Sequence, residues 1–142
     1  MQKPGERSDP VGATGRLVDT LTLQAVLDEA VIAATAADRL LAECSDGERV
    51  SAAVARSGLR LRLRFAQLGR WIEDLDLAGR NEEIRDECSR LLAFYLHLLT
   101  HAMDAPFELR RRNRLTIRSD APLTGAPAAR LQVLRDRLRA AA

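Results

Sequence analysis

Apolar residues between positions 23 and 44 recur at the three- and four-residue spacing of an α-helix. This spacing predicts one long helix that begins between Asp19 and Thr22 and ends at Cys44. Further apolar residues widen the region well beyond one stripe, namely Val18, Ile32, Ala33 and Leu40. We therefore expect this helix to lie at the centre of a bundle or to face a second surface.

The composition agrees with a helical domain. The 142-residue chain is 46% hydrophobic and 30% charged, which is typical of a globular protein. Aromatic residues make up only 4%, so the core must be built mainly from Leu, Ala, Val and Ile. Leu, Ala, Arg and Glu dominate the chain, and all four favour helices. A chain of this length suits one domain.

Proline and glycine set the expected boundaries. Residues 1–15 carry two prolines and three glycines, which predicts a disordered leader before a single domain over 16–142. The segment Ser45-Asp46-Gly47-Glu48 has the form of a capping box, so it should end the first helix and cap a second that runs to about Asp74.

The second helix leaves alternatives open. Gly58 and Gly69 lie inside it and each costs about 1 kcal/mol relative to alanine, so a break or kink at Ser57-Gly58 is one hypothesis. Residues 59–65 alternate Leu and Arg, which is a strand pattern. Helix is favoured because a helical period runs through this segment, formed by Val50, Val54, Leu61, Phe65, Leu68 and Ile72.

Two more helices complete the expected fold. A turn with Gly79 precedes a helix that Asn81 can cap and that ends at Asp104-Ala105-Pro106. Its expected apolar face is Ile84, Cys88, Leu91, Tyr95, Leu98 and Ala102. An irregular loop over 107–126 leads to a basic helix over 127–141. The sequence thus predicts an all-α, antiparallel up-down bundle of about four helices.

Charge is unevenly distributed. The net charge is +2, but residues 107–142 hold nine arginines against three acids, whereas residues 1–106 have a net charge of −4. Docking of this basic segment on the acidic body is the main interpretation. Phosphate contacts by a basic patch are the alternative, which would make the protein a nucleic-acid-associated regulator that uses region 110–139. The patch consists of Arg110, Arg111, Arg112 and Arg114.

His97 and His101 are the only histidines, and they stand four residues apart with Asp104 three residues further on. This spacing can present two imidazoles and a carboxylate to one metal ion. The three residues point away from the expected apolar face, so a solvated polar face is the main interpretation and a metal-binding bundle the second alternative. No nucleophile, phosphate-loop or dinucleotide motif is present. We therefore expect neither an enzyme nor a cofactor.

Cys44 and Cys88 form no C-x-x-C pair, and the first residues lack the apolar core of an export signal. We expect a reduced, cytoplasmic protein with free thiols. The apolar stretch over 30–37 is too short to cross a membrane. Abundant Arg and Ala with one lysine, Lys3, indicate a GC-rich bacterial genome.

The order of these features resembles the flagellin export chaperone family. The landmarks are Leu27-Asp28-Glu29-Ala30 in the first helix, Leu75-Asp76 followed by Gly79 in the turn, Leu91, Phe94, Tyr95, His97 and Ala105 in the third helix, and Leu131, Leu134, Arg135 and Leu138 in the last. The resemblance implies a small antiparallel helical bundle that wraps a segment of a partner protein.

The first helix carries more apolar residues than one buried stripe needs, and the chain shows no catalytic motif. These two observations predict a binding function. We expect a small cytoplasmic protein-binding bundle, chaperone- or adaptor-like, that covers an amphipathic partner segment or associates with a second copy. The expected partner-binding residues are Val26, Leu27, Val31, Trp71, Leu131, Leu134 and Leu138.

Overall fold

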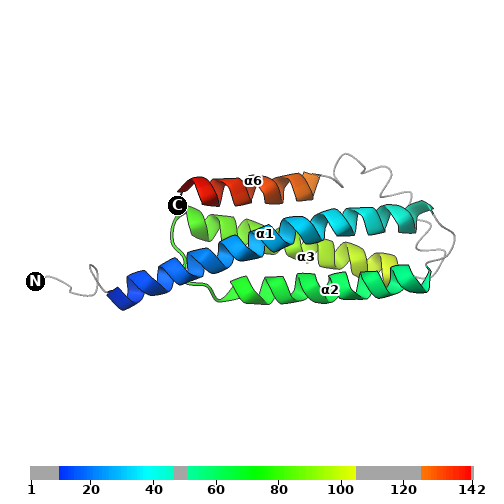
Figure 1. Ribbon diagram of the computed structural model, residues 1–142, viewed down its shortest axis with the longest axis horizontal. Coiled ribbons are helices and arrows are strands. Elements are labelled where there is room, and N and C mark those ends of the chain that lie inside the picture. Colours follow the sequence, from blue (N-terminus) through cyan, green and yellow to red (C-terminus); the bar gives the residue numbers. More distant parts are fainter. Residues whose placement is uncertain (1–9, 47–50, 105–125, 142) are drawn as a thin grey trace, which may run out of the picture.

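A computed structural model describes residues 10–46, 51–104 and 126–141. These residues form four helices and no strand (Figure 1): α1 Pro10–Asp46, α2 Ala52–Glu73, α3 Arg80–Asp104 and α6 Ala126–Ala141. The predicted all-α bundle is confirmed. The alternative of a short strand over 59–65 is wrong, because this segment lies inside α2. No helix in the described ranges is both long and apolar enough to span a bilayer.

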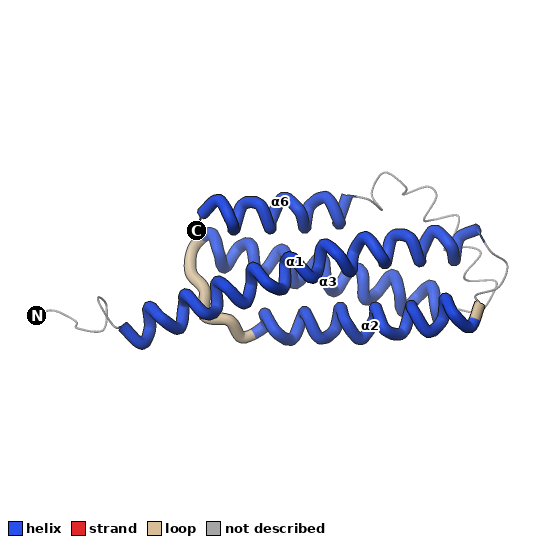
Figure 2. The backbone as a smooth tube through the Cα atoms, in the orientation of Figure 1, coloured by secondary structure: helices blue, strands red, loops and turns tan. Residues whose placement is uncertain are grey.

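The helices pack as an antiparallel bundle in which α1 contacts each of the other three (Figure 2). Glu29 in α1 bonds Arg64 in α2 at 2.7 Å, and Asp28 in α1 bonds Arg139 in α6 at 2.6 Å. The buried surface of α1 carries alanines whose small side chains permit close helix packing: Ala30, Ala33, Ala34 and Ala37. Contacts with three neighbours therefore explain the burial of Ala33 and Leu40, whereas Val18 and Ile32 remain 53% and 67% exposed.

One aromatic side chain connects all four helices. Tyr95 of α3 is fully buried and stacks on Phe65 of α2, with ring centroids 5.2 Å apart. Its hydroxyl donates a hydrogen bond to Asp38 of α1 at 3.0 Å and accepts one from the backbone N–H of Ala128 in α6. Burial is the largest of the causes that raise the pKa of the Tyr95 hydroxyl.

The turn between α2 and α3 follows the sequence prediction in part. Gly79 has a positive φ of 61°, which glycine adopts without strain. Arg85 Nη1 donates to the carbonyl of Leu75 at 3.0 Å, and the backbone N–H of Asp76 donates to Asp19 at 2.8 Å. The expectation that Asn81 precedes and caps α3 is wrong, because this helix already includes Arg80.

The predicted helix starts needed two other corrections. The first helix begins at Pro10, so residues 10–15 of the expected leader are helical, while residues 1–9 lie outside the described part. Ser45 does not cap α2, because it still belongs to α1. Ser51 takes that role, since its side chain accepts the backbone N–H of Val54 at 3.1 Å.

Gly58 does not break α2, which is continuous. A Cβ atom at this position would overlap Sδ of Met103 in α3, so the glycine permits a close approach of the two helices. In α3 the buried positions are Ile84, Cys88, Leu92, Tyr95, Leu99 and Ala102, with the predicted Leu91 and Leu98 partly buried at the edge. The basic last helix begins at Ala126, one residue before the prediction.

Candidate functional site

Six of the seven predicted partner-binding residues are unavailable to a partner in this structure. Their exposed fractions are at most 8%, because the neighbouring helices of the bundle cover them: Val26, Leu27, Val31, Leu131, Leu134 and Leu138. Sequence analysis predicted too much free apolar surface. Spacing alone cannot show that other helices of the same bundle cover the apolar faces of α1 and α6. These six residues are core positions.

Trp71 is the one predicted partner-binding residue that stays exposed, at 46%. The Cζ atom of Arg64 lies 5.5 Å from the centroid of its ring, within the range of a cation–π contact. The same guanidinium bonds Glu29 of α1. Trp71 therefore lies at the edge where α2 meets α1.

The predicted histidine pair is exposed on α3. The rings of His97 and His101 meet edge to face with centroids 5.2 Å apart, and Asp104 is the last residue of the helix. Among the described residues, no group of three or more His, Cys, Asp or Glu side chains is placed to hold a metal ion. The structure thus brings the two imidazoles together without assembling a ligand set around them.

The predicted basic patch, Arg110, Arg111, Arg112 and Arg114, lies outside the described residues. In α6, Arg130 makes a two-point ion pair with Glu87 of α3, with one contact of 2.8 Å between Nη2 and Oε1. This hydrogen bond is the main reason that the pKa of Glu87 is lowered. Together with the Arg139–Asp28 pair, it attaches α6 to acidic residues of α3 and α1, whereas the other arginines of the basic segment lie outside the described residues.

A surface that sequence analysis missed lies on the solvent side of α2. We call it the α2 outer face; all its members are exposed, and they are Arg56, Leu59, Arg60, Leu63 and Arg70. Leu59 and Leu63 are 53% and 60% exposed and stand one helical turn apart. The arginines make no ion pair with any other described residue. The Leu/Arg alternation over residues 59–65, which resembles a strand, could have indicated this surface. On a helix it places Leu59 and Leu63 opposite the buried Leu68.

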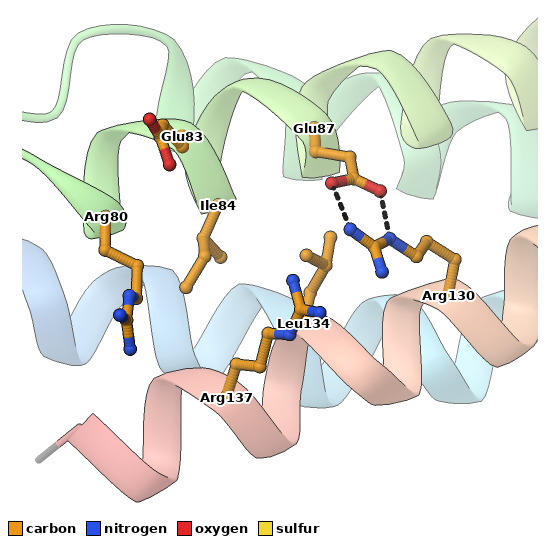
Figure 3. Close-up of a pocket in the computed structure, with 7 residues that line it drawn as sticks. All are labelled: Arg80, Glu83, Ile84, Glu87, Arg130, Leu134 and Arg137. Atoms are coloured by element: carbon orange, nitrogen blue, oxygen red, sulfur yellow. Dashed lines mark hydrogen bonds and ion pairs between the residues drawn. The ribbon is translucent and has the colours of Figure 1, made fainter.

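A pocket of about 450 Å³ opens between the start of α3 and the middle of α6 (Figure 3). We call it the α3–α6 pocket; its lining is Arg80, Glu83, Ile84, Glu87, Arg130, Leu134 and Arg137. Ile84 and Leu134 are core residues and supply its apolar part. The Glu87–Arg130 ion pair closes one end, as the dashed lines in Figure 3 mark.

The residues that the structure describes thus form an antiparallel bundle of four helices, in which α6 is ion-paired with acidic residues of α1 and α3. Comparison with protein families, with curated proteins and with solved structures found no match.

Proposed function

We propose that this chain is a protein-binding helical bundle, chaperone- or adaptor-like, acting in the cytoplasm. The observation that carries the proposal is the α2 outer face, where two exposed leucines are surrounded by three arginines that form no ion pair within the described part of the chain. More than half of each leucine side chain is exposed, so both can bury further apolar area against a partner. The weak resemblance to flagellin export chaperones favours the same class of function.

The charge of the surface specifies the partner's chemistry. Helix α2 contains five arginines and only one acidic residue, Glu73. An amphipathic helix with two neighbouring apolar residues and flanking Asp or Glu side chains would cover Leu59 and Leu63 and pair with Arg56, Arg60 and Arg70. A second copy of the chain is the other occupant that the same surface would accept, through its acidic residues.

The test combines binding of a defined probe with a matched surface control. The probe is a fluorescent, helix-stabilised peptide that carries leucines one turn apart between glutamates, and binding is followed by fluorescence polarisation. Leu59→Ser with Leu63→Ser should weaken binding about tenfold or more, because each buried leucine is worth roughly 1.5–3 kcal/mol. Ile32→Ser, which removes an equally exposed residue of α1, should leave binding unchanged.

Affinity purification with the same three proteins addresses the natural partner. We expect a protein that is retained by the unmodified chain and by Ile32→Ser, is lost with the double serine variant, and is released by salt. Sedimentation of the purified protein shows whether that protein is a second copy. Equal retention by all three chains, or binding of a lysine-bearing peptide as strong as that of the glutamate peptide, would contradict the proposal. Salt-sensitive binding of RNA or DNA that excludes the acidic peptide would support the nucleic-acid alternative instead.

A further inference from the structure

Helix α1 has a second apolar face on the side away from the bundle core. We call it the α1 outer face; all its members are exposed, and they are Leu17, Val18, Leu21, Ala25, Ile32 and Ala36. The four large side chains of this set are 53% to 67% exposed. In Figure 1, α1 crosses in front of α3, and its first turns extend beyond the ends of the other three helices. The described helices of the bundle therefore leave this face open to another chain.

The α1 outer face carries no charge. Between positions 17 and 36, every exposed residue of α1 is apolar or threonine, over a length of about 30 Å along the helix axis. Two acids beside the centre of the face are held within the bundle: Asp28 bonds Arg139 at 2.6 Å, and Glu29 bonds Arg64 at 2.7 Å. A charged partner would find no opposite charge to pair with, whereas a second uncharged face meets no repulsion.

The spacing of the face makes it complementary to itself. Val18, Ala25 and Ile32 stand seven residues apart, which is the repeat by which two helices pack side by side over several turns. Because Ala25 is midway, it lies opposite Ala25 of a second copy whether the two helices run parallel or antiparallel. Val18 and Ile32 then contact either their own equivalents or each other. A surface that matches itself in this way gives a closed, two-fold symmetric dimer.

We propose that the α1 outer face pairs with the same face of a second copy, forming a symmetric dimer with the two α1 helices at its centre. The large apolar side chains of both copies leave water in this contact, which supplies the driving force. The small side chain of Ala25 at the centre lets the two helices approach closely. The net charge of each chain is only +2, so repulsion between the copies is weak. This dimer uses α1 and is independent of the α2 outer face.

Sedimentation equilibrium over a range of protein concentrations tests the dimer. We expect a monomer–dimer equilibrium for the unmodified chain. Leu21→Ser with Ile32→Ser should weaken dimerisation about tenfold or more, because each dimer loses four buried apolar side chains. The matched control is Leu59→Ser with Leu63→Ser, which changes two similarly exposed leucines of α2 and should leave the dimer unchanged. All four exchanged side chains are exposed, so both double variants are expected to fold, which circular dichroism verifies.

Disulfide crosslinking tests whether Ala25 lies at the centre of the pair. Ala25→Cys is combined with Cys44→Ser, which removes the partly exposed native thiol. Under mild oxidation we expect a covalent dimer that a reducing agent separates. The control is Ala93→Cys in the same background, since Ala93 is an exposed alanine of α3 and its cysteine should stay monomeric.

Three outcomes would overturn the proposal: a monomer at every concentration, equal weakening by both double serine variants, or equal crosslinking at positions 25 and 93. Loss of the dimer only with Leu59→Ser and Leu63→Ser would show that the copies associate through the α2 outer face, and the assignment to α1 would be wrong.

Discussion

The hydroxyl of Tyr95 donates a 3.0 Å hydrogen bond to Oδ1 of Asp38, linking the most buried aromatic ring of α3 to a half-buried carboxylate of α1. Phe65 stacks on the same ring from α2. Among the described residues, no buried side-chain polar atom lacks a hydrogen-bond partner. The pair therefore satisfies two polar groups inside an otherwise apolar bundle.

Removing this hydroxyl should destabilise the bundle. Tyr95→Phe keeps the ring and its stacking but leaves Asp38 without its donor, at a cost of about 1–3 kcal/mol in the free energy of unfolding. Urea denaturation followed by circular dichroism measures the change. In the double variant with Asp38→Asn, the loss should be smaller than the sum of the two single changes, because both remove the same interaction. Strict additivity would show that the two groups are not coupled.

Asp38 also predicts a pH dependence. Burial raises its folded pKa above the ordinary value of 3.8, although the bond from Tyr95 opposes the shift. The folded state therefore holds this proton more tightly, so its contribution to stability falls as the pH rises from about 4 through the folded pKa. Asp38→Asn lacks this loss, and its stability relative to the unmodified protein should increase between about pH 4 and pH 7. The lowered pKa of Glu87 acts in the opposite direction, but it is common to both proteins and cancels in the difference. A constant difference across this range would contradict the assignment.

The two glycines inside α2, Gly58 and Gly69, allow the same substitution to be compared at a crowded and at an open position. Gly69→Ala meets no atom within 4 Å, so it should stabilise the protein by about 0.5–1 kcal/mol through helix propensity. Gly58→Ala offers the same propensity gain but must displace Met103, and Leu40 is 3.4 Å from the added atom. Its stability should therefore lie below that of Gly69→Ala. Thermal unfolding of both variants tests this order. Equal stabilisation would mean that displacing Met103 costs no free energy.

The two thiols should differ in reactivity. Cys88 is fully buried, which raises the pKa of its thiol to about 12, whereas Cys44 is partly exposed. An aromatic disulfide reagent should label Cys44 in the folded protein and Cys88 only after unfolding, because the thiolate is the reacting form. Cys44→Ser should abolish labelling under native conditions and leave labelling in denaturant. Rapid labelling of Cys88 in the folded state would indicate local opening of α3.

The helices were predictable, but their ends were less so. Apolar residues at helical spacing identified all four helices, and the period through Leu61, Phe65 and Leu68 correctly outweighed the strand pattern. The cap of α2 was missed because two serines precede the helix. Both Ser45 and Ser51 can cap locally, and the choice depends on how far α1 continues.

The candidate surfaces depended on different information. Leu59 and Leu63 could have been assigned to a solvent face from the helical period alone, since they lie opposite the buried Leu68. The α3–α6 pocket could not, because Arg80 and Arg137 are far apart in the sequence. Only the antiparallel register of the two helices brings them to one pocket.

The sequence by itself determined that this chain forms amphipathic helices, where they lie, and how basic the last one is. These properties follow from local spacing and composition, which each segment carries alone. Tertiary structure decided which apolar residues remain exposed. Val26, Leu131 and the other expected partner-binding positions became core because burial depends on which helices pack together, and that choice is a property of the whole chain.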